Sequence, residues 1–190
     1  ALMQEDEGEA RRQTRGHREI LGPAAERHDG EILQHYGDGT LSLFHSAVEA
    51  VECAVEIQLA VAEKGLVPLR IGLHAGDVVL DDGDVYGDGV NVASRIEGLA
   101  AAGGVMVSGK VYDEIKNHPT LSAKPMGSAR LKNVAEPVAV YAISNDGLRV
   151  PDGLGPAASG DSPVALGPDP IGISSRSSAR SCSISRGSSA

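Results

Sequence analysis

The stretch of sequence that decides the fold covers residues 85–96 and reads VYGDGVNVASRI. Gly87 leads into a helix, whose apolar stripe is expected at Val92, Ile96 and Leu99. Asn91 and Arg95 are four residues apart and therefore project from one face of that helix. An amide and a cation near a helix start could hold ribose and phosphate oxygens, but the same spacing is also typical of an ordinary solvated face.

Helices and short extended runs alternate on both sides of this stretch. The chain is helix-prone from Gln4 to His28, with a kink or break expected at Gly22-Pro23. A capping box of Ser46 and Glu49 opens another helix. The apolar stripe of this second helix is expected at Val48, Val51, Val55 and Ala62. Strands are expected over 31–35, 40–44, 69–74, 77–80, 105–107 and 138–143. The mixture predicts an α+β fold with a mostly antiparallel sheet and helices packed on it.

The sequence YGDG at residues 36–39 predicts a hairpin turn with a carboxylate, Asp38, near its tip. Gly37 and Gly39 on either side allow the backbone and a ligand to approach closely. Such a tip suits a hard cation, Mg²⁺ or Mn²⁺, although most Asp-Gly turns are turns and nothing more. Lys132 is likewise an ordinary surface lysine on spacing alone.

The composition excludes several classes of protein. A net charge of -9 and a sequence pI near 5.1 argue against nucleic-acid binding, which needs a basic face. With few aromatic residues as well, the chain does not fit a ferredoxin-like RNA-binding domain. No apolar run approaches the roughly 20 residues of a membrane helix. Cys53 and Cys182 have no metal-ligand spacing, and Cys53 is expected in the core. These features favour a cytoplasmic domain, either on its own or as part of a membrane-associated full-length protein.

The composition changes after about Asn145, where Gly, Pro, Ala and then Ser dominate. We therefore expect a folded domain over 1–146 and a disordered tail over 147–190. The run of serines and one arginine at 174–178 fits a phosphorylatable linker, a plain flexible linker or out-of-frame sequence.

Four ordered blocks resemble the class III adenylate/guanylate cyclase catalytic domain. They are GDG at 37–39, RIGLHAG at 70–76, VYGDGVNVASRI at 85–96 and LKNVAEPV at 131–138. The resemblance covers residues 1–143 and implies a ferredoxin-like core that forms a head-to-tail homodimer. It also implies conversion of ATP to 3′,5′-cyclic AMP and pyrophosphate by in-line attack at a two-metal site shared between protomers.

The resemblance implies a role for each matching residue. Asp38 would be one of two metal-binding aspartates, with Gly37 beside it in the turn that approaches the substrate. Asp84 would recognise the purine base, and Asn91 would orient the ribose. Arg95 would stabilise the transition state, and Lys132 would bind the terminal phosphates. Regulatory domains are expected outside this chain.

Two departures from the family pattern leave alternatives open. The family's opening central strand and its metal aspartate are expected to be missing here, so this fragment should be inactive or weakly active. Gln34 stands where the family has an adenine-selecting lysine. ATP remains the expected substrate over GTP, because glutamine can donate to a purine nitrogen while Asp84 accepts from an amine. The alternatives are a guanylate cyclase, or a catalytically degenerate domain that dimerises and signals.

Overall fold

The structure, a computed structural model, describes residues 2–36, 39–81, 84–154 and 177–186, with side chains over 8–35, 39–78 and 87–154. Four helices are described: α1 (Leu2–Arg27), α2 (Ala47–Glu63), α3 (Asp88–Glu97) and α4 (Gly109–Ile115). The described strands are β1 (Gly30–Tyr36), β2 (Gly39–Phe44), β3 (Leu69–Asp81), β4 (Asp84–Tyr86), β5 (Gly104–Ser108), β6 (Ala123–Ala129), β7 (Val138–Ile143) and β8 (Ser177–Arg186). The predicted α+β class is confirmed.

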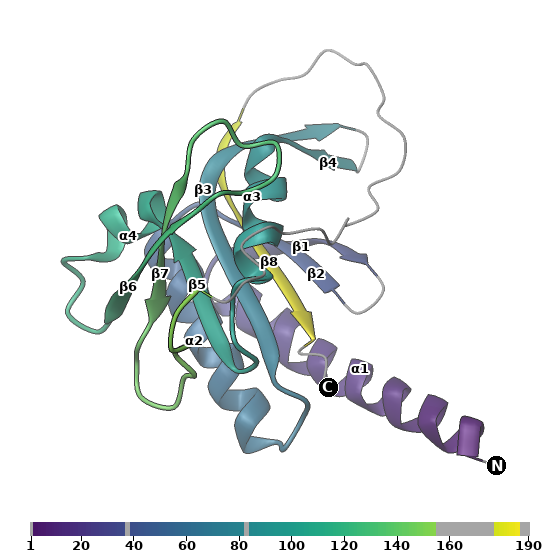
Figure 1. The fold of residues 1–190 in the computed structure, drawn as a ribbon. Helices are drawn as coiled ribbons and strands as arrows, with labels where there is room; N and C mark the ends of the chain where they lie inside the picture. Colours follow the sequence, from purple (N-terminus) through teal and green to yellow (C-terminus); the bar gives the residue numbers. More distant parts are fainter. Residues whose placement is uncertain (1, 37–38, 82–83, 155–176, 187–190) are drawn as a thin grey trace.

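One mixed sheet runs through the molecule in the order β1-β2-β8-β3-β5-β7-β6, and β4 pairs with the far end of β3 (Figure 1). All neighbouring strands are antiparallel except β3 and β5, which are parallel. In the described part of the chain α1 comes first, and the central position between β2 and β3 is filled by β8. The sheet is therefore continuous from β1 to β6.

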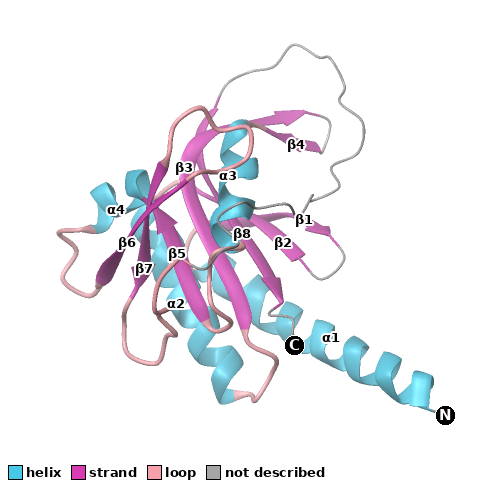
Figure 2. Cartoon of the chain, viewed as in Figure 1, coloured by secondary structure: helices cyan, strands magenta, loops and turns pink. Residues whose placement is uncertain are grey.

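Helices cover both faces of this sheet (Figure 2). On one face α1, α2 and α4 bury the main core with odd-numbered residues of β3, such as Ile71 and Leu73. On the other face α3 packs Val92 and Ile96 against Met106 of β5 and Val140 of β7. Successive strand residues point to opposite faces, so β5 contributes Val105 and Val107 to the first core and Met106 to the second.

Local signals explain the helix boundaries. Ser46 caps α2, because its hydroxyl accepts a 3.4 Å hydrogen bond from the backbone N–H of Glu49. Gly65 follows the end of α2 with a φ of 62°, a conformation that glycine adopts without strain. Pro23 lies inside α1, and the chain stays helical on both sides of it, so the helix is not broken there.

Several expected elements differ in the structure. The strands expected over 69–74 and 77–80 are one long strand, β3, because Gly76 lets α3 lie against an uninterrupted backbone. The apolar stripe of α2 is rotated from the expected one: Val51 is buried, Val48 and Val55 are half-buried, and Ala62 is exposed. Strand β6 was not expected.

The segment 147–190, expected to be disordered, differs from that expectation in two places. Leu148, Val150 and Leu154 pack against the two cores, and the Arg149 backbone bonds Gly103 at 3.0 Å. Residues 177–186 form β8 between two strands that would otherwise expose unpaired edges. Residues 155–176 and 187–190 lie outside the described residues.

Candidate active site

Helix α3 lies unusually close to β3, and glycines make this approach possible. A Cβ atom on Gly72 would fall 2.2 Å from the backbone nitrogen of Glu97 and 2.5 Å from the carbonyl oxygen of Ala93. Gly76 and Gly89 face each other farther along, where a Cβ on Gly76 would lie 3.1 Å from the Cα of Gly89. Backbone-to-backbone packing therefore fixes the position of α3 on the sheet.

Asn91 and Arg95 both lie on α3, as the sequence predicts. Asn91 is exposed and Arg95 is half-buried in the last turn, while the opposite stripe of the helix is buried in the core. Residues four apart share a helix face, so the amide and the guanidinium project from the same side. The close packing of α3 against β3 fixes the backbone from which both side chains project.

The predicted base-recognition residue, Asp84, begins β4, and its backbone pairs with Asp81 of β3. A single residue, Gly87, links β4 to α3, with a φ of 142° that favours glycine. A Cβ atom there would fall 2.6 Å from the carbonyl oxygen of Asp77. This turn keeps Asp84 close to Asn91 along the chain. The structure describes the backbone of Asp84 but not its side chain.

Lys132 is exposed on the connection from β6 to β7. Its neighbour Leu131 is buried in the same cluster as Val92 and Ile96 of α3. The structure thus brings the Lys132 segment against the helix that carries Asn91 and Arg95.

Gln34 lies on β1, the edge strand at the other end of the sheet from β6. It is half-buried there, and its backbone pairs with Leu41 of β2. Gly37 and Asp38 connect β1 to β2 and lie outside the described residues. From β1 to β7 the sheet order counts five strand steps, about 24 Å. Five strand steps therefore separate the strand of Gln34 from β7 beside the Lys132 segment, whereas the neighbouring Leu33 shares a buried cluster with Val90 of α3.

Two buried polar side chains near α3 had no predicted role. His74, on the α3 face of β3, is 7% exposed, and its Nδ1 has no hydrogen-bond partner among the described residues. Burial, with a smaller contribution from Lys110, lowers the pKa of His74 to about 4, so the ring is neutral at pH 7. Ser108, at the end of β5, is fully buried, and its hydroxyl likewise lacks a partner within the described part. The sequence places His74 in the RIGLHAG block at 70–76, but it does not show that the side chain is buried. The structure shows this burial.

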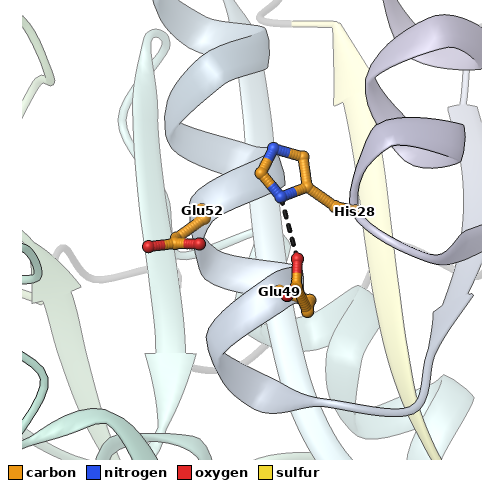
Figure 3. Close-up of side chains that lie close together, drawn as sticks. All are labelled: His28, Glu49 and Glu52. Atoms are coloured by element: carbon orange, nitrogen blue, oxygen red, sulfur yellow. Dashed lines mark hydrogen bonds and ion pairs between the residues drawn. The ribbon is translucent and has the colours of Figure 1, made fainter.

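A group of potential metal ligands lies elsewhere, where α1 meets α2 (Figure 3). His28, Glu49 and Glu52 each offer one ligand atom, and these atoms all lie within 4.8 Å of one another. The ring is already engaged, because Nδ1 lies 3.0 Å from Glu49 and Nε2 lies 2.9 Å from Glu56. Burial alone would lower the pKa of His28, but the hydrogen bonds to Glu56 and Glu49 raise it above its ordinary value. The contacts suit an imidazolium that clamps α1 to α2.

Comparison with known proteins identifies the class to which this arrangement belongs. Residues 37–145 match the family described as "Adenylate and Guanylate cyclase catalytic domain". A crystal structure of an adenylate/guanylate cyclase/hydrolase from Silicibacter pomeroyi superposes with a TM-score of 0.67 and 35% identity, over 72% of this chain and 85% of that one. The chain belongs to the adenylate and guanylate cyclase catalytic domain family.

Two further relatives mark the extent of the similarity. "Putative adenylate cyclase 3" of Rhizobium meliloti (strain 1021) is 37% identical over 145 residues, which are 72% of this chain and 25% of that protein. Adenylate cyclases from Trypanosoma brucei, in their monomeric state, share the fold with a TM-score of 0.61 at 20% identity, over 70% of this chain and 78% of that one. The chain thus spans a quarter of the Rhizobium protein. Among the described residues, no helix combines the length and apolar character needed to cross a bilayer.

Proposed function

We propose that this chain is an adenylate cyclase catalytic domain that converts ATP to cyclic AMP and pyrophosphate as a head-to-tail homodimer. The observation that carries the proposal is the division of the candidate residues. Asn91, Arg95 and the Lys132 segment gather around α3, whose Val90 also packs with Leu33, Leu41 and Leu43 of β1 and β2. Asp38 belongs to the connection between the edge strand β1 and β2. A two-fold arrangement can bring one edge of each protomer against the α3 region of its partner and complete two equivalent sites.

Each residue has a task that its chemistry suits. The Asn91 amide can hold ribose oxygens, and Arg95 can donate several hydrogen bonds to phosphate oxygens as charge develops at the α-phosphorus. Lys132 can neutralise the terminal phosphates. Asp84 can accept from the exocyclic amine of adenine while Gln34 donates to a ring nitrogen.

The donor chemistry of the hairpin fits a divalent cation. Tyr36 and Gly39 pair at the end of the hairpin, so Asp38 belongs to its two-residue connection, and a carboxylate is a preferred ligand of Mg²⁺ and Mn²⁺. When bound, the cation would acidify the 3′-hydroxyl and neutralise triphosphate oxygens.

A second candidate function is a degenerate cyclase domain that dimerises without catalysis. Gln34 in the position of the family's lysine favours it. A preference for GTP is a further alternative. The Rhizobium relative is about four times longer than the matched region, and we propose that regulatory domains accompany this domain in the whole protein.

The test is product formation by purified dimers at high protein concentration. ATP and GTP are supplied separately with Mn²⁺ or Mg²⁺, and cyclic nucleotides are quantified by mass spectrometry. We expect cyclic AMP, and a loss of roughly 10²–10³ in rate for Arg95→Ala. Arg130→Ala, an exposed arginine outside the site, is the matched control and should retain the rate. A folded dimer that forms no cyclic nucleotide under any of these conditions would favour the non-catalytic candidate.

A further inference from the structure

We propose that His28, Glu49 and Glu52 form a binding site for a divalent transition-metal ion of the Zn²⁺ type, between the end of α1 and helix α2. The site lies on the face of the sheet that α1, α2 and α4 cover, whereas α3 with Asn91 and Arg95 covers the other face. It is therefore separate from the candidate active site, and the inference does not depend on cyclase activity.

The core holds the backbone on both sides of the site. Ala24 of α1 and Val51 and Ala54 of α2 are buried in the same cluster. His28 follows the last turn of α1, and its backbone N–H donates a 3.1 Å hydrogen bond to the carbonyl oxygen of Ala25. The side chain of His28 is only 17% exposed. The ring therefore reaches α2 from a position that packing fixes.

The possible ligand atoms converge from one face of α2. Glu49 and Glu52 are three residues apart, so their side chains are neighbours on the helix. Figure 3 shows both projecting from α2 beside the ring of His28. One ring nitrogen and one oxygen of each carboxylate all lie within 4.8 Å of one another.

The spacing of these atoms is close to that of a zinc site. Donor atoms around one tetrahedral Zn²⁺ are roughly 3.3 Å apart, because each lies about 2.0–2.2 Å from the ion. The 3.0 Å between Nδ1 of His28 and Oε2 of Glu49 is near this value. Glu52, whose side chain is 34% exposed, can close the remaining distance by rotating. Its Oε1 accepts a 3.3 Å hydrogen bond from the hydroxyl of Thr120, which lies on the connection after α4.

The contacts behind the ring of His28 are those of a metal-binding histidine. Such a histidine binds the ion through one ring nitrogen and donates the other N–H to a carboxylate, which fixes the orientation of the ring. Here Nδ1 faces Glu49, while Nε2 lies 2.9 Å from Oε2 of Glu56. Arg27 donates to the other carboxylate oxygen of Glu56 at 3.1 Å. The partner that orients the ring is thus itself held in place.

The charge and the donor types indicate which ion the site would take. Glu49, Glu52 and Glu56 supply three negative charges and Arg27 supplies one positive charge, so the cluster has a net charge of −2 when the ring is neutral. A dication that replaces the Nδ1 proton of the imidazolium balances this charge. Imidazole combined with carboxylates suits Zn²⁺ and its neighbours in the transition series, whereas Mg²⁺ prefers oxygen ligands alone.

The experiment titrates the full-length chain with Zn²⁺ in excess Mg²⁺ and without nucleotide. Calorimetry measures the stoichiometry and the affinity, and long-range ¹H–¹⁵N spectra report on each histidine ring nitrogen. Glu52→Gln is the main variant, because the hydrogen bonds of His28 go to Glu49 and Glu56 and remain when Glu52 is replaced. Glu63→Gln, at an exposed position of the same helix outside the cluster, is the matched control.

We expect wild type and Glu63→Gln to bind Zn²⁺ with equal affinity. Glu52→Gln should bind it at least about tenfold more weakly, since loss of even an outer partner of a ligand costs roughly 10–100-fold. The ring nitrogens of His28 should shift on binding, while those of His35 on β1 should not. The proposal is overturned if Glu52→Gln binds Zn²⁺ as tightly as wild type, or if the His28 resonances do not respond. It is also overturned if Mg²⁺ displaces Zn²⁺ at equal concentration.

Discussion

Gly72 of β3 and Glu97 of α3 are so close that a Cβ atom on the glycine would lie 2.2 Å from the backbone nitrogen of Glu97. No flexible side chain can move aside here, because the nearest atoms are backbone. Helix α3, which carries Asn91 and Arg95, can therefore lie this close to β3 only because Gly72 has no side chain.

Gly72→Ala should displace α3 and reduce the free energy of unfolding by roughly 1–3 kcal/mol, the usual cost of overpacking. Chemical denaturation measures the loss. The matched control is Gly22→Ala, since a Cβ atom on Gly22 of α1 meets nothing within 4 Å. This control should be neutral or stabilising by up to about 1 kcal/mol, because alanine is the better helix former. Equal stability of both variants would contradict the close packing.

The contacts of His28, which follows α1, with Glu49 and Glu56 of α2 predict a pH-dependent stabilisation of the packing between the two helices. The pKa of His28 is raised in the folded protein, so the stabilisation is present below the ordinary pKa and is lost as pH rises through the folded value. A double-mutant cycle with His28→Gln and Glu56→Gln should give a coupling of roughly 0.5–1 kcal/mol near pH 5.5, and less near pH 8.5. Glu63, on α2 outside this cluster, provides the control pair, which should show no coupling. A His28–Glu56 coupling that grows with pH would refute the clamp.

His74 predicts the opposite pH response. Its folded pKa of about 4 lies below the ordinary value of 6.5. The contribution of the neutral ring to folding stability is therefore complete above pH 6.5 and declines as pH falls toward 4. Wild type should lose on the order of 2 kcal/mol relative to His74→Gln over that interval. Thermal or urea unfolding at several pH values measures the difference. His118→Gln, on the surface connection after α4, is the control for replacing a histidine outside the core. A constant difference between wild type and His74→Gln would mean that His74 is not held neutral by burial.

Much of the fold could be predicted because its signals are local. The antiparallel pairing of β1 with β2, the Ser46 cap and helix α3 each depend on neighbouring residues, and all appear in the structure. The sequence predicted a break between strands at Ala75-Gly76. In the structure the strand continues, and Gly76 allows close packing against Gly89. Strands β6 and β8 have weak β propensity, and their pairing partners determine them instead.

The candidate site was assembled from motif residues, but its division across the sheet was not predictable from them. That division depends on strand order, because β1 reaches one edge while the Lys132 segment packs under α3. The neutral state of His74 likewise depends on burial, which a single residue in a motif does not reveal.

The central claim, a catalytic site shared by two protomers, is tested most directly by mixing two inactive variants. Asp38→Ala and Arg95→Ala should each abolish cyclic AMP formation in homodimers. A mixed dimer has one site with both lesions and one with neither. With random exchange of equal amounts about half of the dimers are mixed, so roughly a quarter of wild-type activity should return. No recovery, with subunit exchange verified by native mass spectrometry and with wild type active, would contradict the shared site.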